Sequence, residues 1–131
     1  MKVRTIKVRE AAVEREAVAA ACEILDRGGL VAFPTETVYG LAARADRPDA
    51  VLRLRDLKVR DDGKPFTLHV GSRAAIEDAV GALSGVGRRF VSKGLPGPLT
   101  LVFDVQEADR ERFNHACGLG SGSDVYNGGT V

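Results

Sequence analysis

The spacing of hydrophobic positions along the chain predicts several helices. Residues 11–27 give the clearest one, because Ala17, Ala20 and Ile24 recur at spacings of three and four while acidic residues lie mostly on the other side. A Gly-Gly pair at positions 28–29 follows, as a left-handed helix end requires. The remaining helical patterns are shorter: residues 49–57, then residues 74–83 and 87–93, which predict two helices or one interrupted helix.

Four other segments have patterns typical of β-strands. Residues 30–33 form a continuous apolar run, which suits a strand buried on both faces. Residues 66–70 and 99–103 alternate between apolar and polar positions, as in a strand with one buried face. Residues 2–8 are rich in β-branched side chains and predict an opening strand. Strands alternating with helices predict an α/β or α+β sheet protein.

Three segments lack a regular pattern. Residues 34–40, Pro-Thr-Glu-Thr-Val-Tyr-Gly, form a polar turn between two apolar stretches, and residues 61–65 form a loop. Residues 117–131 hold five Gly and two Ser and have no closing element. The length of 131 residues fits a single domain over residues 1–131. The irregular Gly-rich tail gives that domain the pattern of an interrupted fold.

Composition and charge narrow the classes of protein. With 44% hydrophobic and 28% charged residues, the chain has the composition of a folded domain. Nineteen Lys and Arg against eighteen Asp and Glu give a net charge of +1, so a basic site for nucleic acid must be local. No apolar run approaches the ~20 residues of a membrane helix, and a signal peptide is not evident. Two cysteines, Cys22 and Cys117, predict reduced thiols in a cytoplasmic protein.

Several familiar catalytic motifs are absent from the sequence. It has no phosphate-binding G-x-x-x-x-G-K-[ST] loop, no G-x-S-x-G nucleophile elbow and no H-E-x-x-H zinc helix. The soft metal ligands are few: His69, His115, Cys22 and Cys117. Because a closed zinc site needs four ligands at suitable spacing, we expect no metal-ligating residues.

Candidate binding residues lie near the ends of the predicted elements. Thr35 and Thr37 follow the apolar run, at the strand end where open α/β sheets usually bind ligands, although capping of the following turn explains them as well or better. Lys58 and Arg60 are separated by one residue, so their charges could clamp a phosphate or carboxylate. The alternative for this pair is a solvated helix end whose cations complement the dipole.

Two further candidates lie on the polar sides of predicted strands. His69 is on the side of Thr67, although a lone strand histidine is more often a hydrogen-bonded structural group. Thr100 follows the Leu-Pro-Gly-Pro turn in the same way. Residues 53–73 carry six cations and three anions, a local basic excess in a balanced chain. The combination predicts a site for an anionic ligand together with a small zwitterion.

Four motifs together resemble the YrdC/Sua5 (TsaC) family of L-threonylcarbamoyladenylate synthases. They are GGLVAFPTETVYGL at residues 28–41, KVR at 58–60, KPFTLHV at 64–70 and LPGPLTL at 95–101. They occur in the family order, and the match spans residues 8–103. The resemblance implies an α/β fold with an open, twisted mixed sheet, helices, and a concave, positively charged surface.

Members of this family combine L-threonine, bicarbonate or CO2, and ATP into threonylcarbamoyl-AMP and pyrophosphate, for t6A37 modification of tRNA. The resemblance implies threonine binding by Thr35, Tyr39 and His69, catalytic phosphate binding by Lys58 and Arg60, and a nucleotide or threonine contact by Thr100. It also implies Mg²⁺ with the ATP substrate, the t6A-transferase machinery as a partner, and association with tRNA or double-stranded RNA.

The sequence departs from the family pattern at two places. Asp61 stands where the family usually has Pro, and it could lower phosphate affinity, hold Mg²⁺ or pair with Lys64. The family pattern also continues into a further strand and a Ser-x-Asn motif, whereas nothing after Phe103 matches. We therefore expect the last part of the fold to be missing. The alternative functions are a non-catalytic YrdC-like module that binds double-stranded RNA or tRNA, and an inactive fragment.

Overall fold

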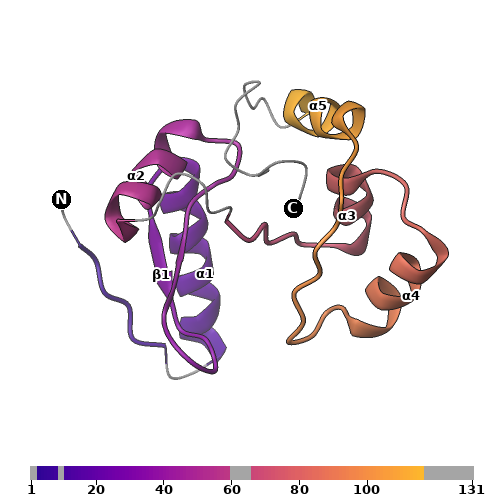
Figure 1. Cartoon of the computed structure of the whole chain (residues 1–131). Coiled ribbons are helices and arrows are strands. Elements are labelled where there is room, and N and C mark those ends of the chain that lie inside the picture. The colour runs from indigo at the N-terminus through magenta and orange to yellow at the C-terminus, as the bar shows by residue number, and fades with distance from the viewer. Residues whose placement is uncertain (1–2, 9–10, 60–65, 117–131) are drawn as a thin grey trace. The chain divides into compact units, whose positions relative to one another are not determined.

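A computed structural model describes residues 3–8, 11–59 and 66–116 of the chain. Within these residues, five helices and two short strands follow one another (Figure 1). In chain order they are α1 (Ala11–Asp26), β1 (Val31–Phe33), β2 (Gly40–Ala42), α2 (Pro48–Lys58), α3 (Arg73–Val80), α4 (Gly85–Gly94) and α5 (Glu107–Ala116). The contacts divide the chain into two compact units, Met1–Lys58 and Val59–Val131. A single domain over the whole chain stays a prediction.

α1 ends where the sequence predicts, at the Gly-Gly pair. Gly28 has a φ of +74°, a left-handed conformation that glycine adopts without steric cost. Its amide donates to the carbonyl of Leu25 at 2.8 Å. The Gly29 amide donates to the carbonyl of Ile24 at 2.7 Å, so two carbonyls of the last turn are satisfied. The helix predicted over residues 11–27 is confirmed.

β1 and β2 pair as an antiparallel hairpin, with Ala32 opposite Leu41 and Phe33 opposite Gly40. The ring of Phe33 covers Gly40, where a Cβ atom would lie 2.6 Å from Cζ of the ring. The strand predicted at residues 30–33 is confirmed, but burial on both faces is wrong, because Ala32 is exposed. A short apolar run does not by itself distinguish a central strand from a half-buried hairpin.

α2 completes the first unit and confirms the helix predicted at residues 49–57. Ala50 and Leu54 are buried on its inner side. Asp49 lies in its first turn and Lys58 in its last, so both charges complement the helix dipole. α2 therefore carries Lys58 at its carboxyl end.

In the second unit, α3 and α4 are two separate helices, each with its own serine N-cap. Ser72 Oγ accepts a hydrogen bond from the Ala75 amide at 3.2 Å. Ser84 Oγ accepts one from the Gly87 amide at 3.1 Å. Each serine satisfies an amide that the helix start leaves open, so the two helices begin independently.

The core of the second unit lies between α3 and α4. Three side chains are buried together there: Ile76, Leu83 and Val91. Four partly buried apolar residues pack against them: Val80, Leu95, Leu101 and Phe103. α5 packs against α3, and the sequence did not predict it, because Phe113 is its only large apolar residue.

The strands predicted at residues 2–8, 66–70 and 99–103 are wrong: residues 3–8, 66–70 and 99–103 contain no strand. Alternation nevertheless marks the inward side of the last segment, since Leu101 packs on the core while Val102 is 72% exposed. A strand also needs a neighbour for its backbone hydrogen bonds, and alternation does not supply one. The mixed α and β class is confirmed, but the sheet in the described residues is a two-stranded antiparallel one rather than an open mixed sheet.

Candidate functional site

The turn between β1 and β2 holds Thr35, whose hydroxyl closes the turn upon itself. Its Oγ1 accepts from the amides of Thr37 and Val38, at 3.3 and 3.2 Å. It also lies 2.5 Å from the carbonyl oxygen of Val38, to which it donates. A hydroxyl has one donor and two acceptor positions, so these contacts use its full capacity. Of the two interpretations of Thr35, ligand binding and turn capping, these contacts are those of turn capping. Binding of threonine by Thr35 stays a prediction.

Tyr39 and Lys58 are the other two candidates in the first unit. Tyr39 ends the same turn and is 76% exposed. Lys58 is the last residue of α2 and is exposed as well. The next residue, Val59, has a φ of +46°, which a β-branched residue rarely adopts. Backbone strain of this kind gathers at functional sites, and here it falls between the two cations predicted to bind phosphate.

His69 and Thr100 belong to the second unit. Both are exposed and lie in segments without regular secondary structure. Thr35 and Tyr39 thus share one turn, Lys58 ends a helix of the same unit, and the remaining described candidates belong to the other unit. Arg60 lies outside the described residues, as do Asp61 and Lys64 of the loop and the Gly-rich tail at 117–131.

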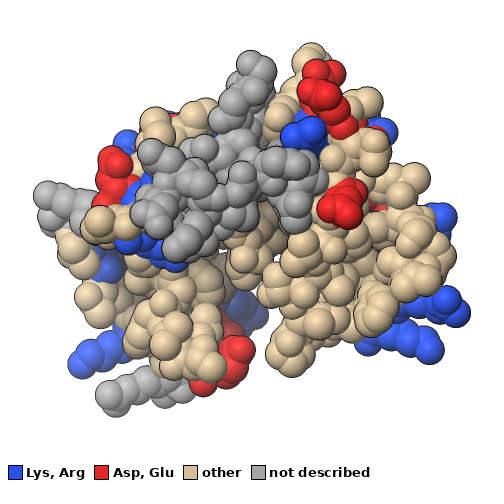
Figure 2. Space-filling view, in the orientation of Figure 1, with Lys and Arg blue, Asp and Glu red and all other residues tan. Residues whose placement is uncertain are grey.

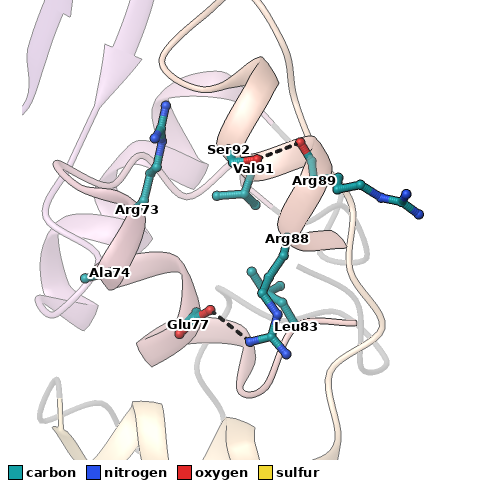
Figure 3. A pocket seen from close by; sticks show the side chains of 8 residues that line it. All are labelled: Arg73, Ala74, Glu77, Leu83, Arg88, Arg89, Val91 and Ser92. Atoms are coloured by element: carbon teal, nitrogen blue, oxygen red, sulfur yellow. Dashed lines mark hydrogen bonds and ion pairs between the residues drawn. The ribbon is translucent and has the colours of Figure 1, made fainter. Parts of the chain in front are cut away.

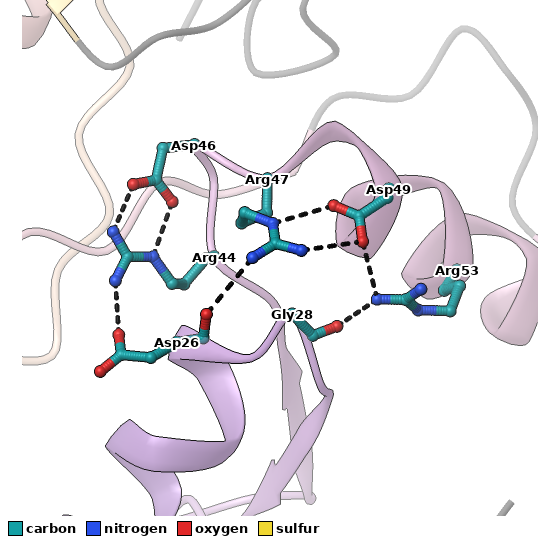
Figure 4. A network of polar contacts seen from close by, with 7 residues as sticks. All are labelled: Asp26, Gly28, Arg44, Asp46, Arg47, Asp49 and Arg53. Carbon is teal, nitrogen blue, oxygen red and sulfur yellow. Dashed lines mark hydrogen bonds and ion pairs between the residues drawn. The ribbon is translucent and has the colours of Figure 1, made fainter.

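A network of arginines and aspartates surrounds the end of α1, and the sequence reasoning did not find it (Figure 4). Its members are Asp26, Gly28, Arg44, Asp46, Arg47, Asp49 and Arg53. Arg44 donates from Nε to Asp46 at 2.7 Å and from Nη1 to Asp26 at 2.5 Å. The available signal was the Arg-Ala-Asp-Arg-Pro-Asp run at residues 44–49, which alternates the two charges.

The same network joins α1 to α2. Arg47 donates from Nε to Asp49 at 3.0 Å and from Nη1 to the backbone carbonyl of Asp26 at 3.3 Å. Arg53, one turn further along α2, donates to Asp49 at 3.2 Å and to the carbonyl of Gly28. The side chains therefore bind backbone carbonyls at the end of α1 and just beyond it, in the segment that leads to β1.

Hydrogen bonds within the network shift several pKa values. Those from Arg44 lower the pKa of Asp46, and those from Arg47 lower the pKa of Asp49. The same bonds raise the pKa of Arg44 and of Arg47. Because each carboxyl has a lower pKa in the folded chain, the ionised forms stabilise the fold above the ordinary value of 3.8. That stabilisation is lost as the pH falls through the folded pKa.

Asp46→Asn is expected to reduce this acid sensitivity. The variant should unfold at a lower temperature than the unaltered chain at neutral pH, since it removes the ionised partner of Arg44. The difference should shrink as the pH falls through the lowered folded pKa of Asp46, because the unaltered chain then loses the charge that the variant never has. Thermal denaturation across the pH range measures it, with Asp56→Asn, an exposed carboxylate on α2, as the control. An unchanged dependence on pH in Asp46→Asn would contradict the account.

A cavity of about 400 Å³ opens between α3 and α4 in the second unit (Figure 3). Leu83 and Val91 give it an apolar side. At its rim, Arg88 faces Glu77 with 3.7 Å between Nη1 and Oε1, and Arg73 rises from the start of α3. The cavity therefore has an apolar wall beneath a mostly basic rim.

Metal ligands and membrane-spanning segments are both lacking in the part of the chain that the structure describes. No three His, Cys, Asp or Glu side chains gather there in a way that could hold a metal ion. None of these helices combines the length and the apolar character needed to cross a membrane. Cys22 is a free, exposed thiol.

The helices and the hairpin define a protein of mixed α and β structure, and comparison with known proteins identifies its family. Residues 23–118 match the Sua5/YciO/YrdC family model, which is described as "Telomere recombination". This segment covers more than half of the chain. The chain belongs to the Sua5/YciO/YrdC family.

Curated relatives and a solved structure agree with this assignment. Threonylcarbamoyl-AMP synthase of Pyrococcus abyssi is 37% identical, over 78% of this chain and 30% of its own length. The Thiobacillus denitrificans enzyme of the same name is 42% identical, over 60% of this chain and 42% of its own. The crystal structure of P. abyssi Sua5 with L-threonine is 26% identical, with a TM-score of 0.62, over 86% of this chain and 38% of that one. The chain thus spans less than half the length of these relatives.

Proposed function

We propose that the chain is an L-threonylcarbamoyladenylate synthase, which joins L-threonine, bicarbonate or CO2, and ATP into threonylcarbamoyl-AMP and pyrophosphate. The observation that carries the proposal is the family match at residues 23–118. That segment contains all six site residues that the family resemblance implies: Thr35, Tyr39, Lys58, Arg60, His69 and Thr100. Relatives matched over the same region carry the name of this enzyme.

L-threonine is the proposed amino-acid substrate, bound by Thr35, Tyr39 and His69. A related Sua5 was crystallised with L-threonine, which supports this choice. The hydrogen bonds of Thr35 hold the β1–β2 turn in one conformation, and Tyr39 is exposed at its end. A fixed turn lowers the entropy lost when a ligand binds. Besides its proposed contact with threonine, Thr35 shapes the turn that presents Tyr39.

Lys58 and Arg60 are the proposed catalytic residues, and they would act by binding the phosphates of ATP. In the proposed step, an oxygen of N-carboxylated threonine attacks the α-phosphorus. The bond from that phosphorus to the bridging oxygen breaks, and pyrophosphate leaves with the electron pair. Fixed cations stabilise the negative charge on the transferring group, and phosphoryl-type transfers depend on such electrostatics more than on a strong base.

Mg²⁺ is proposed to arrive with ATP rather than in a protein cage. The described residues offer no group of three carboxylate, histidine or cysteine side chains to hold it. Mg²⁺ commonly keeps several waters and binds through substrate phosphates. When present, it would neutralise phosphate charge beside Lys58.

The product would supply the threonylcarbamoyl group for t6A37 modification of tRNA by the t6A-transferase machinery. We place this activity in the cytoplasm, where tRNA is processed and where an exposed free thiol such as Cys22 stays reduced. ATP binding and nucleotidyl transfer follow from the same reaction. The proposal needs no further cofactor.

A second candidate is a module that binds tRNA or double-stranded RNA without catalysis. Basic side chains gather over α4 on the face shown in Figure 2, and this helix carries Arg88, Arg89 and Lys93. Phe90, on the same helix, is 57% exposed. Exposed aromatic and basic side chains together suit contacts with bases and phosphates. Filter binding across a salt series decides: affinity that is absent or insensitive to salt excludes this function.

The synthase activity is tested by measuring pyrophosphate release with and without L-threonine. The chain is expected to release pyrophosphate from ATP when L-threonine and bicarbonate are both present. Omitting L-threonine, or replacing it with D-threonine, should reduce release to the level without protein. Release that does not depend on L-threonine would contradict the proposal.

A further inference from the structure

The segment that carries Thr100 is held at its start by a side chain from another helix. Arg73, the first residue of α3, donates from both Nε and Nη2 to the backbone carbonyl of Leu95, at 2.9 and 2.5 Å. Leu95 caps α4 and opens the Leu-Pro-Gly-Pro turn that leads to Thr100. Two donors from one guanidinium fix the direction of that carbonyl as well as its position.

The turn is also folded tightly against the end of α4. The Leu95 amide donates to the carbonyl of Val91 at 3.2 Å, and the Leu99 amide donates to that of Gly97 at 2.8 Å. A Cβ atom at Gly94 would lie 2.6 Å from Cδ2 of Leu99. One at Gly97 would lie 2.5 Å from the carbonyl oxygen of Gly94. These close approaches leave residues 94–99 little room for another backbone path. The bond from Arg73 fixes the start of this segment, at Leu95.

The helix that carries Arg73, α3, is itself held in place at its start. Ser72 caps the start of α3 through the Ala75 amide at 3.2 Å. One turn later, Ile76 is buried in the core of the unit, where Leu95 and Leu101 also pack. Because helix and turn share this core, the bond from Arg73 connects two fixed elements rather than a fixed and a loose one.

We propose that Arg73 is a positioning residue for nucleotide binding: its bond to the Leu95 carbonyl orients the turn that places Thr100. The inference rests on the proposed function, and it takes the nucleotide rather than the threonine as the contact of Thr100. Arg73 also lines the cavity between α3 and α4 (Figure 3), but two of its donors already bind Leu95. Arg88 lines the same cavity and pairs with Glu77 instead, which makes it a matched arginine without a contact to the turn.

The test compares Arg73→Gln, Arg73→Lys and Arg88→Gln in the full chain. Calorimetric titration is expected to show ATP binding weakened about tenfold in Arg73→Gln, which corresponds to ~1.4 kcal/mol. L-threonine binding should stay unchanged. Arg73→Lys should recover part of the affinity, because an ammonium still donates to the Leu95 carbonyl. Arg88→Gln should bind ATP as the unaltered chain does.

A double-mutant cycle identifies the path of the effect. If Arg73 acts through Thr100, then Arg73→Gln should weaken ATP binding much less in a Thr100→Ala background than in the unaltered one. Amide hydrogen exchange gives a readout that needs no ligand. Exchange should become faster at Leu95 and Leu99 in Arg73→Gln, while the amides of α5 keep their rates.

The outcomes separate the two proposals. Tenfold weaker ATP binding, a less than additive double mutant and faster exchange confined to the turn support the positioning role. Unchanged ATP binding in Arg73→Gln overturns that role alone and leaves the synthase proposal standing. Equal weakening of ATP and L-threonine binding, with faster exchange throughout the unit, would show that Arg73 only stabilises the fold. That result also overturns the positioning role. If the unaltered chain binds no ATP, the proposed function fails and the positioning role fails with it.

Discussion

Lys58→Ala is expected to lower the rate of pyrophosphate release by about 100-fold or more, and to weaken ATP binding more than L-threonine binding. A fixed cation at the phosphates stabilises charge that develops during transfer, so its loss affects the transition state more strongly than the bound substrates. Lys58 ends α2, whose first two turns are held by the Arg47–Asp49–Arg53 contacts. The helix should therefore keep its place when the side chain is shortened.

The matched control for this prediction is Lys93→Ala. Lys93 lies in the last turn of α4, as Lys58 lies in the last turn of α2, so both cations complement a helix dipole. If Lys58 were only a solvated helix-end cation, the two variants would behave alike. Equal rates in the two variants, or a larger loss of threonine affinity than of ATP affinity in Lys58→Ala, would contradict the assigned role.

Ile76→Ala is expected to lower the free energy of unfolding by about 2–5 kcal/mol. Ile76 is 7% exposed and packs with Leu83 and Val91, so truncation removes buried methyl groups and leaves a void. Urea denaturation measures the change. Val86→Ala, on α4 and 54% exposed, is the control and should change stability by about 0.5 kcal/mol or less.

Equal effects in the two variants would show that these helices do not share a core. The prediction bears on the site as well, because Leu95 and Leu101 pack on the same cluster and flank Thr100. Loss of Ile76 should therefore also speed amide exchange in the turn.

The first four helices, α1 to α4, could be predicted because their signals are local, whereas α5 could not. Gly28 stops α1 by its own conformation, and Ser72 and Ser84 start α3 and α4 by bonds within one turn. Strands depend on partners elsewhere in the chain, which explains the errors at residues 66–70 and 99–103. The pairing of Phe33 with Gly40 is visible only once the hairpin is formed.

The candidate site could be predicted in residue type but not in arrangement. The motifs select Thr35, Lys58 and Thr100, yet the turn bonds of Thr35 and the strain at Val59 follow from backbone geometry. The bond from Arg73 to Leu95 joins the first residue of α3 to the residue that caps α4, and it leaves no local pattern in the sequence. Such contacts become visible only when the packing of the helices is known.

The most direct test of the proposed reaction is to follow isotope-labelled bicarbonate. The chain, L-threonine, ATP and labelled bicarbonate are incubated together, and the nucleotide products are separated and weighed by mass spectrometry. We expect threonylcarbamoyl-AMP that carries the label, formed together with an equal amount of pyrophosphate. Pyrophosphate without labelled threonylcarbamoyl-AMP, or ATP that stays intact, would contradict the proposed function.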